Sequence, residues 1–578
     1  MKHQFSVWAP LARRVEVQLG DIRRPMRPES RGWWDAILEC GGPRIDYGFI
    51  LDGEGPYPDP RSPWQPDGVH ALSRWVDQTA FRWTDAGFKP APLGAAVLYE
   101  LHVGTFTPAG TFDAAIEKLE HLVQLGITHV ELMPVNAFAG HHGWGYDGVG
   151  LFAVHQPYGG PEALKRFVDA CHARRIGVLL DVVYNHLGPS GNYLGKFGPY
   201  FSACYQTPWG PALNFGGRQS DEVRQFFCEN ALMWLRDYHF DGLRLDAVHA
   251  ILDTSAKHFL EELREEVAKL ESQLGRRLVL IAESDLNDPR LLWPSERGGF
   301  GLHAQWSDDF HNALHALLTG ERMGYYEDFG RLADLAKALT NAYVYDGQFS
   351  KYRQRRHGRP HGGLNGHRFV GYIQNHDQIG NRVMGHRLSQ LVDVSRVKMA
   401  AALVLTGPFV PLLFMGEEWG ASTPFLYFAD HQEPVLAKAV REGRRKEFAA
   451  WGWRPAEIPD PQARETFENS KLNWNELAEP AHSEMHDWYR QLIQLRRRET
   501  CLADSEFSQI KARYAETARW LAIERGPVTI VCNFGDSEQN IPIKRAKHQV
   551  LLTSTKTLPP VGGSVVLPGW AIAILKQV

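Results

Sequence analysis

The stretch FDGLRLDAVH, residues 240 to 249, places an arginine and an aspartate in a segment that otherwise resembles a buried strand. Side chains alternate along a strand, so Arg244 and Asp246 should share one face while Leu243 and Leu245 share the other. Burying charge is costly unless the charge is paired or used. Arg244 is placed to keep Asp246 ionised through a charge-assisted hydrogen bond. Taken alone, the stretch leaves a structural ion pair as the alternative.

Other apolar runs also end in acidic or polar residues. LVLIAE ends in Glu283, FVGYIQNHD ends in Asp377, and DVVYNH contains Asp181 and His186. In a parallel barrel the carboxyl ends of all strands lie at one mouth. We therefore expect Asp246, Glu283 and Asp377 to converge there, which makes Arg244 and Asp246 part of a reactive site.

Converging carboxylates surrounded by aromatic loops fit glycoside hydrolysis. One carboxylate attacks the anomeric carbon while a protonated acid donates to the leaving oxygen, so the surroundings must separate the two pKa values. We predict Asp246 as the nucleophile and Glu283, which rises from an apolar strand, as the general acid/base. A metal-dependent hydrolase is the main chemical alternative, but no candidate strand carries the HxH pair typical of barrel metal sites. We expect no cofactor.

These acids require a scaffold of short apolar strands alternating with amphipathic helices, and this sequence pattern begins near Ala96. Eight such strands favour a closed (β/α)8 TIM barrel with long strand-to-helix loops over an open sheet. The candidate strands are Val97–His102, His129–Met133, Gly177–Val183, Gly242–Asp246, Leu278–Glu283, Leu302–Trp306, Phe369–Ile373 and Pro411–Met415.

The 578-residue chain is too long for one ordinary domain, and we expect three. Residues 1–90 contain short strand-like pieces such as Val15–Leu19 and predict a β-sandwich domain. Residues 91–485 predict the catalytic barrel. Residues 486–578 predict a last helix followed by an antiparallel β-domain.

Charge and cysteine content narrow the partners and the compartment. The formal net charge of −4 includes no long basic run, so we do not expect a nucleic-acid partner. The first ten residues lack the apolar core of a secretory signal, and six scattered cysteines fit reduced thiols, which together predict a cytoplasmic protein. The uncharged run Met399–Gly416 is broken by glycine and proline, so it predicts a buried helix, a turn and a strand, with no membrane association.

Four stretches, DVVYNH, GLRLDAVH, the glutamate of LIAESD, and QNHDQIG, resemble the four signature regions of the α-amylase superfamily, glycoside hydrolase family 13. The resemblance implies a retaining double displacement on α-1,4-glucans, with Asp246 and Glu283 in the roles given above and Arg244 as the partner of the nucleophile. It implies that Asp377 grips the hydroxyls of the sugar in subsite −1. The same resemblance makes His186 and His376 hydrogen-bonding residues of that subsite and Tyr146, in WGYDG, its stacking platform.

Within the superfamily, three longer stretches resemble the maltooligosyltrehalose trehalohydrolases: AESDLNDPRLL, QNHDQIGNRVMGHRL and PLLFMGEEWGASTPFLYFADH. This resemblance implies cleavage of the α-1,4 bond between a maltooligosyl chain and a terminal α,α-trehalose, with a maltooligosyltrehalose synthase as pathway partner. Candidates for the trehalose side are His249, Ser284, Asp285, Asp308 and Asp309. The alternatives are an α-glucan branching or debranching enzyme, and a non-catalytic glycan-binding protein, which the retention of all three acids disfavours.

Overall fold

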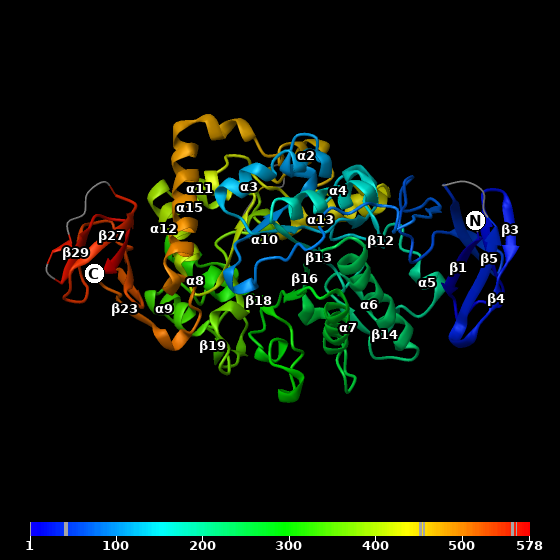
Figure 1. The fold of residues 1–578 in the computed structure, drawn as a ribbon, viewed down its shortest axis with the longest axis horizontal. Coiled ribbons are helices and arrows are strands. Elements are labelled where there is room, and N and C mark those ends of the chain that lie inside the picture. Colours follow the sequence, from blue (N-terminus) through cyan, green and yellow to red (C-terminus); the bar gives the residue numbers. More distant parts are fainter. Residues whose placement is uncertain (1, 40–43, 450–453, 455–456, 556–559, 562) are drawn as a thin grey trace.

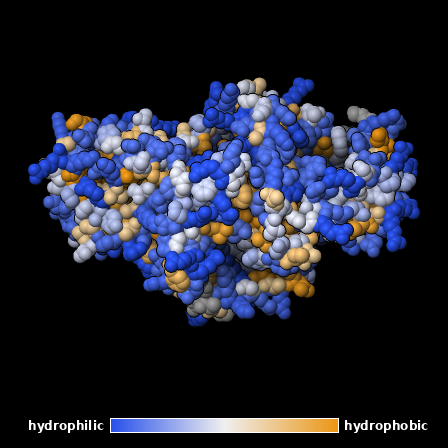
Figure 2. Space-filling view, turned by 90° about the horizontal axis from the view of Figure 1, so that it is seen from below, coloured by the Kyte–Doolittle hydropathy of each residue, from blue (hydrophilic) through white to orange (hydrophobic). Residues whose placement is uncertain are grey.

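The computed structural model describes residues 2–39, 44–449, 454, 457–555, 560–561 and 563–578. The chain is elongated, with the N-terminal sheets at one end, the C-terminal sheets at the other and a barrel between them (Figure 1). Its surface is mostly hydrophilic on the face shown in Figure 2, where hydrophobic side chains form small separate groups. No helix among the described residues is both long and apolar enough to cross a bilayer.

Two small antiparallel sheets form the N-terminal part. β5 (Trp33–Glu39) pairs with β1 (Lys2–Trp8) and β4 (Arg27–Pro28) in one sheet. The other has the order β3-β2-β6-β7, with β8 paired to β6; the strands are β2 (Val15–Leu19), β3 (Ile22–Pro25), β6 (Asp46–Leu51), β7 (Glu54–Tyr57) and β8 (Ser73–Arg74). Trp33 donates from its indole nitrogen to Glu222 of α6 (Ser220–Asp237) over 3.0 Å, which ties this part to the barrel.

Eight parallel strands close into a barrel, which confirms the predicted fold class. Each predicted strand is present, and most are shorter than the apolar run that predicted them. In spatial order the strands are β9 (Leu98–Leu101), β10 (His129–Leu132), β13 (Gly177–Val182), β16 (Gly242–Leu245), β17 (Val279–Ala282), β18 (Ala304–Trp306), β21 (Phe369–Gly371) and β22 (Val410–Phe414).

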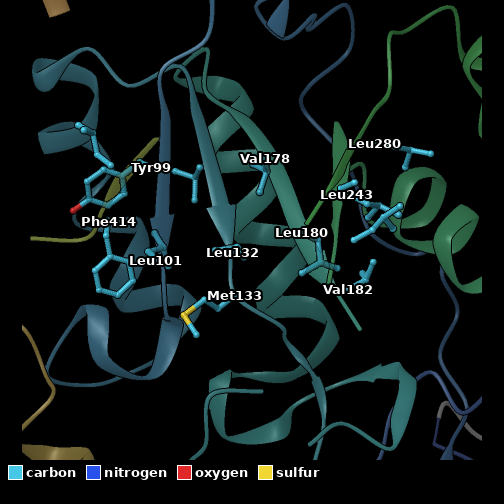
Figure 3. Packing of buried hydrophobic residues seen from close by; sticks show 14 of the residues in the cluster. Tyr99, Leu101, Leu132, Met133, Val178, Leu180, Val182, Leu243, Leu280 and Phe414 are labelled. Carbon is cyan, nitrogen blue, oxygen red and sulfur yellow. The ribbon is translucent and has the colours of Figure 1, made fainter. Parts of the chain in front are cut away.

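Side-chain alternation separates an apolar outer face from a mixed interior. Val178, Leu180 and Val182 of β13 face the surrounding helices, as Figure 3 shows for these and equivalent residues of neighbouring strands. Leu179 of the same strand belongs to a separate cluster that fills the barrel interior. Asp181, two residues further on, therefore lies inside the barrel and nearer its C-terminal mouth.

Helices cover the barrel strands, and local signals fix where they begin. The ring includes α3 (Leu119–Leu125), α4 (Gly160–Ala173), α6, α7 (Phe259–Leu274), α8 (Asp308–Thr319), α9 (Leu332–Asn341), α12 (Val394–Thr406) and α15 (Pro480–Arg498). The Asp393 side chain caps α12 by accepting from the amides of Ser395 and Arg396. The run Met399–Gly416 is divided between α12, a turn and β22, all buried, as predicted.

The C-terminal part is an antiparallel β-structure that follows α15, the predicted last helix, which begins at Pro480. One sheet has the order β23-β24-β25-β30-β27 and the other β26-β29-β28. Their strands are β23 (Ile510–Ala515), β24 (Trp520–Arg525), β25 (Val528–Asn533), β26 (Gln539–Pro542), β27 (His548–Thr553), β28 (Pro560–Val561), β29 (Ser564–Leu567) and β30 (Ala571–Gln577). β23 packs against α9 and β30 against α12.

The cysteines within the described residues are free: Cys171, Cys204, Cys228, Cys501 and Cys532. The sixth, Cys40, lies outside the described residues.

Candidate active site

The strand β16 is shaped by its first residue. A side chain at Gly242 would bring its Cβ to 2.4 Å from the backbone oxygen of Val279 on β17, so only glycine allows the two strands to lie this close. Two residues later Arg244 points into the barrel, where its guanidinium is fully buried and lies 4.2 Å from the centroid of the Trp306 ring. The predicted alternation is confirmed, because Leu243 and Leu245 belong to the core between strands and helices.

Arg244 contacts three carboxylates. Its Nη1 donates to Asp246 Oδ1 over 2.8 Å and to both oxygens of Asp181 over 2.8 and 2.9 Å. Its Nη2 lies 2.9 Å from Oε2 of Glu283. One buried cation therefore organises acids from three adjacent strands, β13, β16 and β17, which is more than the pair expected from the sequence.

Asp246 is held through both of its oxygens. Oδ1 accepts from Arg244, and Oδ2 accepts from Nδ2 of Asn185 over 2.7 Å. Burial favours the neutral acid and raises the pKa of Asp246, but the positive charge of Arg244, reinforced by His186 and Asn185, outweighs burial and lowers it below its usual value. Asp246 is thus an ionised carboxylate with a fixed orientation.

Glu283 follows β17 and lies opposite the turn after Asp246. Ala247 has φ 38° and ψ 51°, a left-handed backbone that turns its amide toward Glu283, whose Oε2 accepts from it over 2.8 Å. Burial raises the pKa of Glu283 well above its usual value; Arg244 opposes this shift, and the negative charges of Asp246 and Asp377 add to it. The two acids therefore have pKa shifts in opposite directions, which is the condition for a nucleophile beside a proton donor.

Asp377 lies at the start of the short helix α10 (His376–Gly380) and is the most exposed of the three predicted acids, with 36% of its side chain accessible, against 20% for Glu283 and 11% for Asp246. Its Oδ2 is 3.5 Å from Nε2 of His376. Burial lowers the pKa of His376, but Asp377 and Glu100 outweigh it and raise the pKa to about 9. His376 is therefore an imidazolium at neutral pH.

Tyr146 links the two halves of the site. It lies in the loop between β11 (Asn136–Ala137) and β12 (Gly150–Val154), and its hydroxyl contacts Asp181 over 2.5 Å and His376 over 2.8 Å. The rings of Tyr146 and His376 stack with centroids 5.1 Å apart. Burial raises the pKa of Asp181 to about 6, against the opposing charge of Arg244. The predicted platform and the predicted hydrogen-bonding histidine are thus in one connected network.

Two acids inside the barrel were missed by the sequence analysis. Glu100 of β9 accepts from both the backbone amide and Nδ1 of His376, over 3.0 and 2.5 Å. Glu131 of β10 pairs in register with Glu100, and neither of its buried carboxyl oxygens has a hydrogen-bond partner. Burial raises the pKa of Glu131 well above its usual value, so it is neutral. Both acids lie inside predicted strands, but their meaning depends on the neighbouring strand, with which they pair in register.

His186 lies at the rim of the site. Its Nδ1 is 2.5 Å from Oδ1 of Asn185, and its ring stacks against Trp209 with centroids 5.3 Å apart. Trp209 lies in the turn between β14 (Phe201–Thr207) and β15 (Gly210–Leu213) and is half exposed. The long loop after β13 thus carries an aromatic side chain to the mouth, as expected.

Three of the residues predicted for the trehalose side have solvent or partners other than Arg244 around them. His249 is exposed, and Asp285 forms a 2.7 Å ion pair with Arg353. Asp309 is buried, and its Oδ2 accepts from Asn287 and from the amides of Val344 and Tyr345. Through these hydrogen bonds Asp309 links the segment of Asn287 to that of Val344 and Tyr345.

No group of three or more His, Cys, Asp or Glu side chains within the described ranges is arranged to hold a metal ion. The acids of the site are instead bound to Arg244, Asn185, Tyr146 and His376. Carboxylates that are oriented by hydrogen-bonding side chains suit covalent and acid/base catalysis.

Comparison with known proteins supports the family and the fold. The family model described as alpha amylase, catalytic domain, matches residues 76–198, and a model of a domain of unknown function, DUF3459, matches residues 505–574. A crystal structure of a putative alpha amylase from Salmonella typhimurium superposes with a TM-score of 0.91 at 37% identity, covering 100% of this chain and 98% of that one.

Curated relatives share the full length. A malto-oligosyltrehalose trehalohydrolase from Rhizobium sp. (strain M-11) is 50% identical over 99% of this chain and 98% of its own. One from Mycobacterium tuberculosis (strain CDC 1551 / Oshkosh) is 49% identical over 99% of both chains. Because this identity extends over the β-sheets at both ends as well as the barrel with its acids, the chain belongs to the malto-oligosyltrehalose trehalohydrolase family.

Proposed function

We propose that the protein is a retaining glycoside hydrolase that cleaves the α-1,4 bond between a maltooligosyl chain and a terminal α,α-trehalose, releasing trehalose. The observation that carries the chemistry is the opposite pKa shift of Asp246 and Glu283 around one arginine. Membership of the family supports the assignment of the substrate. We propose Asp246 as nucleophile, Glu283 as general acid/base and Asp377 as the residue that grips the hydroxyls of the reacting sugar.

The reaction has two steps in this proposal. In the first, a carboxylate oxygen of Asp246 bonds to the anomeric carbon while Glu283 gives its proton to the glycosidic oxygen, and trehalose leaves. In the second, Glu283 takes a proton from water, the water oxygen bonds to the anomeric carbon and Asp246 is released. Both steps invert the anomeric centre, so the new reducing end keeps the α configuration.

Arg244 supports both steps. Burial lowers the pKa of Arg244, but the negative charges of Asp181, Glu283 and Asp246 outweigh burial and raise it well above its usual value. Arg244 therefore stays charged. While Asp246 is bonded to the sugar, Arg244 remains paired with Asp181 and no buried cation is left alone. Tyr146 is proposed as the platform under the reacting sugar, with His186 and His376 as donors to its hydroxyls.

The protein is proposed to act in the cytoplasm on chains made by a maltooligosyltrehalose synthase, with glucan and not nucleic acid as its partner. Its low net charge and scattered free cysteines support this setting.

The test is product analysis on maltooligosyltrehalose beside plain maltooligosaccharide of matched length. We expect free trehalose and a shortened maltooligosaccharide from the first substrate and much slower cleavage of the second. Branched product from linear glucan without trehalose release would contradict the proposal and favour the branching alternative. Polarimetry or NMR of the fresh product should show the α anomer first, whereas initial β product would contradict retention.

A further inference from the structure

A second cavity lies at the opposite end of the barrel from the acids. Its volume is about 640 Å³, within the range of ligand-binding pockets. The segments that line it lead into or begin the barrel strands: residues 89–94 before β9, His129 of β10, residues 277–279 at β17, His303 before β18, and 365–368 before β21. Because every strand runs away from it toward the catalytic mouth, this cavity shares no lining residue with that site.

Arg368 is the main polar group of the cavity. Its Nη2 donates to the backbone oxygens of Leu292 and Leu302, over 2.6 Å each, and its Nε is buried without a hydrogen-bond partner. In the described part of the chain no carboxylate forms an ion pair with it. A partly buried guanidinium without an acid keeps its positive charge uncompensated.

Other charges around the cavity do not compensate it. Arg277 and Lys89 add two exposed positive charges at the rim. The two acids of the lining already have partners: Asp241 contacts His172 and Arg276 over 3.0 and 3.2 Å, and Glu271 lies 3.8 Å from Arg264. The cavity therefore has an excess of positive charge.

His303 supplies a neutral donor beside these cations. Nδ1 of His303 accepts from the amide of Leu280 over 2.9 Å, so the ring hydrogen must be on Nε2. Nε2 of His367 is buried and has no partner. The remaining wall, formed by Pro90, Pro92, Leu93 and Val279, is apolar.

We propose that this cavity binds a small organic phosphate ester, with the phosphate on Arg368, Arg277 and Lys89 and the organic body against the proline and leucine wall. The exposed guanidinium of Arg277 can offer a fork to the oxygens of a phosphate, Arg368 and Lys89 add positive charge beside it, and a dianion would neutralise the excess charge of the cavity. The volume exceeds what a bare phosphate ion fills, which favours an ester over the free ion.

The test is calorimetric titration of the full-length protein with ribose 5-phosphate, inorganic phosphate and ribose. Ribose 5-phosphate is not a glucan, so the catalytic site offers it little. We expect saturable binding of the ester, at least about 10-fold weaker binding of inorganic phosphate, and none of ribose. Arg277→Gln, at an exposed side chain, should weaken the ester by about 5- to 10-fold, and Arg368→Gln by more. The matched control, Arg23→Gln on β3, should leave binding unchanged.

Four outcomes would overturn the proposal. One is no saturable binding of the ester to the unmodified protein. A second is binding that Arg277→Gln leaves unchanged, which would place the ester elsewhere even if Arg368→Gln fails to fold. The third is equal affinity for inorganic phosphate, which would assign the site to the free ion. Retained binding in Asp246→Asn would support a site separate from the catalytic one, and lost binding there would contradict it.

Discussion

The two ends of the barrel hold arginines in opposite surroundings. At the C-terminal mouth, Arg244 contacts Asp181, Asp246 and Glu283 within 3 Å. At the N-terminal end, Arg368 donates only to backbone oxygens and leaves its Nε without a partner. Arg244 lies in β16 and Arg368 directly precedes β21. The difference therefore lies in which acids the neighbouring strands provide.

This difference separates a site built for chemistry from one suited to binding. Charges that are matched within the protein fix the orientation and the pKa of a carboxylate before substrate arrives, as catalysis requires. A cation without an internal acid has an unsatisfied preference for an anion, as ligand recognition requires. The five predictions below test this contrast, from the largest expected effect to the smallest.

Asp246→Asn should reduce the rate of trehalose release by at least ~10²-fold, because the amide cannot form the covalent intermediate. The thermal unfolding midpoint should change little, since Asn185 and Arg244 can still contact a side chain of the same shape. Steady-state kinetics and a thermal melt measure the two effects. A rate within a few-fold of the unmodified protein would remove Asp246 from the mechanism.

Arg244→Met should lower both activity and stability, because it leaves Asp181 and Asp246 buried without their cation. Breaking a buried ion pair from one side costs about 3–5 kcal/mol. Arg368→Met is the matched control at the other end and should cost less, because it leaves no carboxylate behind. Denaturant unfolding measures both losses. Equal losses for the two variants would contradict the contrast between the ends of the barrel.

The pH profile of the rate should be bell-shaped. Asp246 must be ionised and its pKa is lowered, so activity falls only in acid, as pH drops through that lowered pKa. Glu283 must be protonated and its pKa is raised, so activity falls as pH rises through that raised pKa. Measurement of kcat/KM as a function of pH checks both falls in activity. With Glu283→Gln and a substrate whose leaving group needs no proton, the alkaline fall should disappear; if it stays, another group causes it.

Asp241→Asn should reduce stability without reducing the rate constant of hydrolysis. Asp241 and Asp85 flank His172, and although burial lowers the pKa of that histidine, the two acids outweigh it and raise the pKa above its usual value. A histidine whose pKa is raised by folding stabilises the protein fully below about pH 6.5, its usual pKa. This stabilisation is lost as pH rises through the raised pKa of the folded state. The variant should lose about 1–3 kcal/mol at pH 6 and less at pH 9, measured by denaturant unfolding. A pH-independent loss would exclude His172 as the cause.

Glu131→Gln should have the smallest effect, within about 1 kcal/mol in stability and a few-fold in rate. Glu131 is already neutral, so an amide of the same shape changes little. Glu100→Gln is the matched control on the neighbouring strand and should lower the rate more, because it removes a charge that keeps His376 protonated. Similar effects of the two substitutions would show that Glu131 is ionised as well.

The sequence was sufficient for the barrel because its strands are short apolar runs whose signal is local. It was also sufficient for the three acids, which follow such runs at the end that parallel strands share. It was insufficient for Glu100 and Glu131, because an acid in the middle of a strand is informative only when its neighbours across the sheet are known. The same reason explains Asp309, whose partners come from segments 22 to 36 residues away.

The sequence by itself determined the fold class, the pairing of Arg244 with Asp246 and the position of the three acids at strand ends, since alternation and strand ends are properties of consecutive residues. Only the tertiary structure decided the rest. Closure of the barrel brought Asp181 and Glu283 onto the same guanidinium as Asp246, and it left Arg368 at the other end without an acid. Register between strands fixes these contacts, and register arises when distant segments pack together.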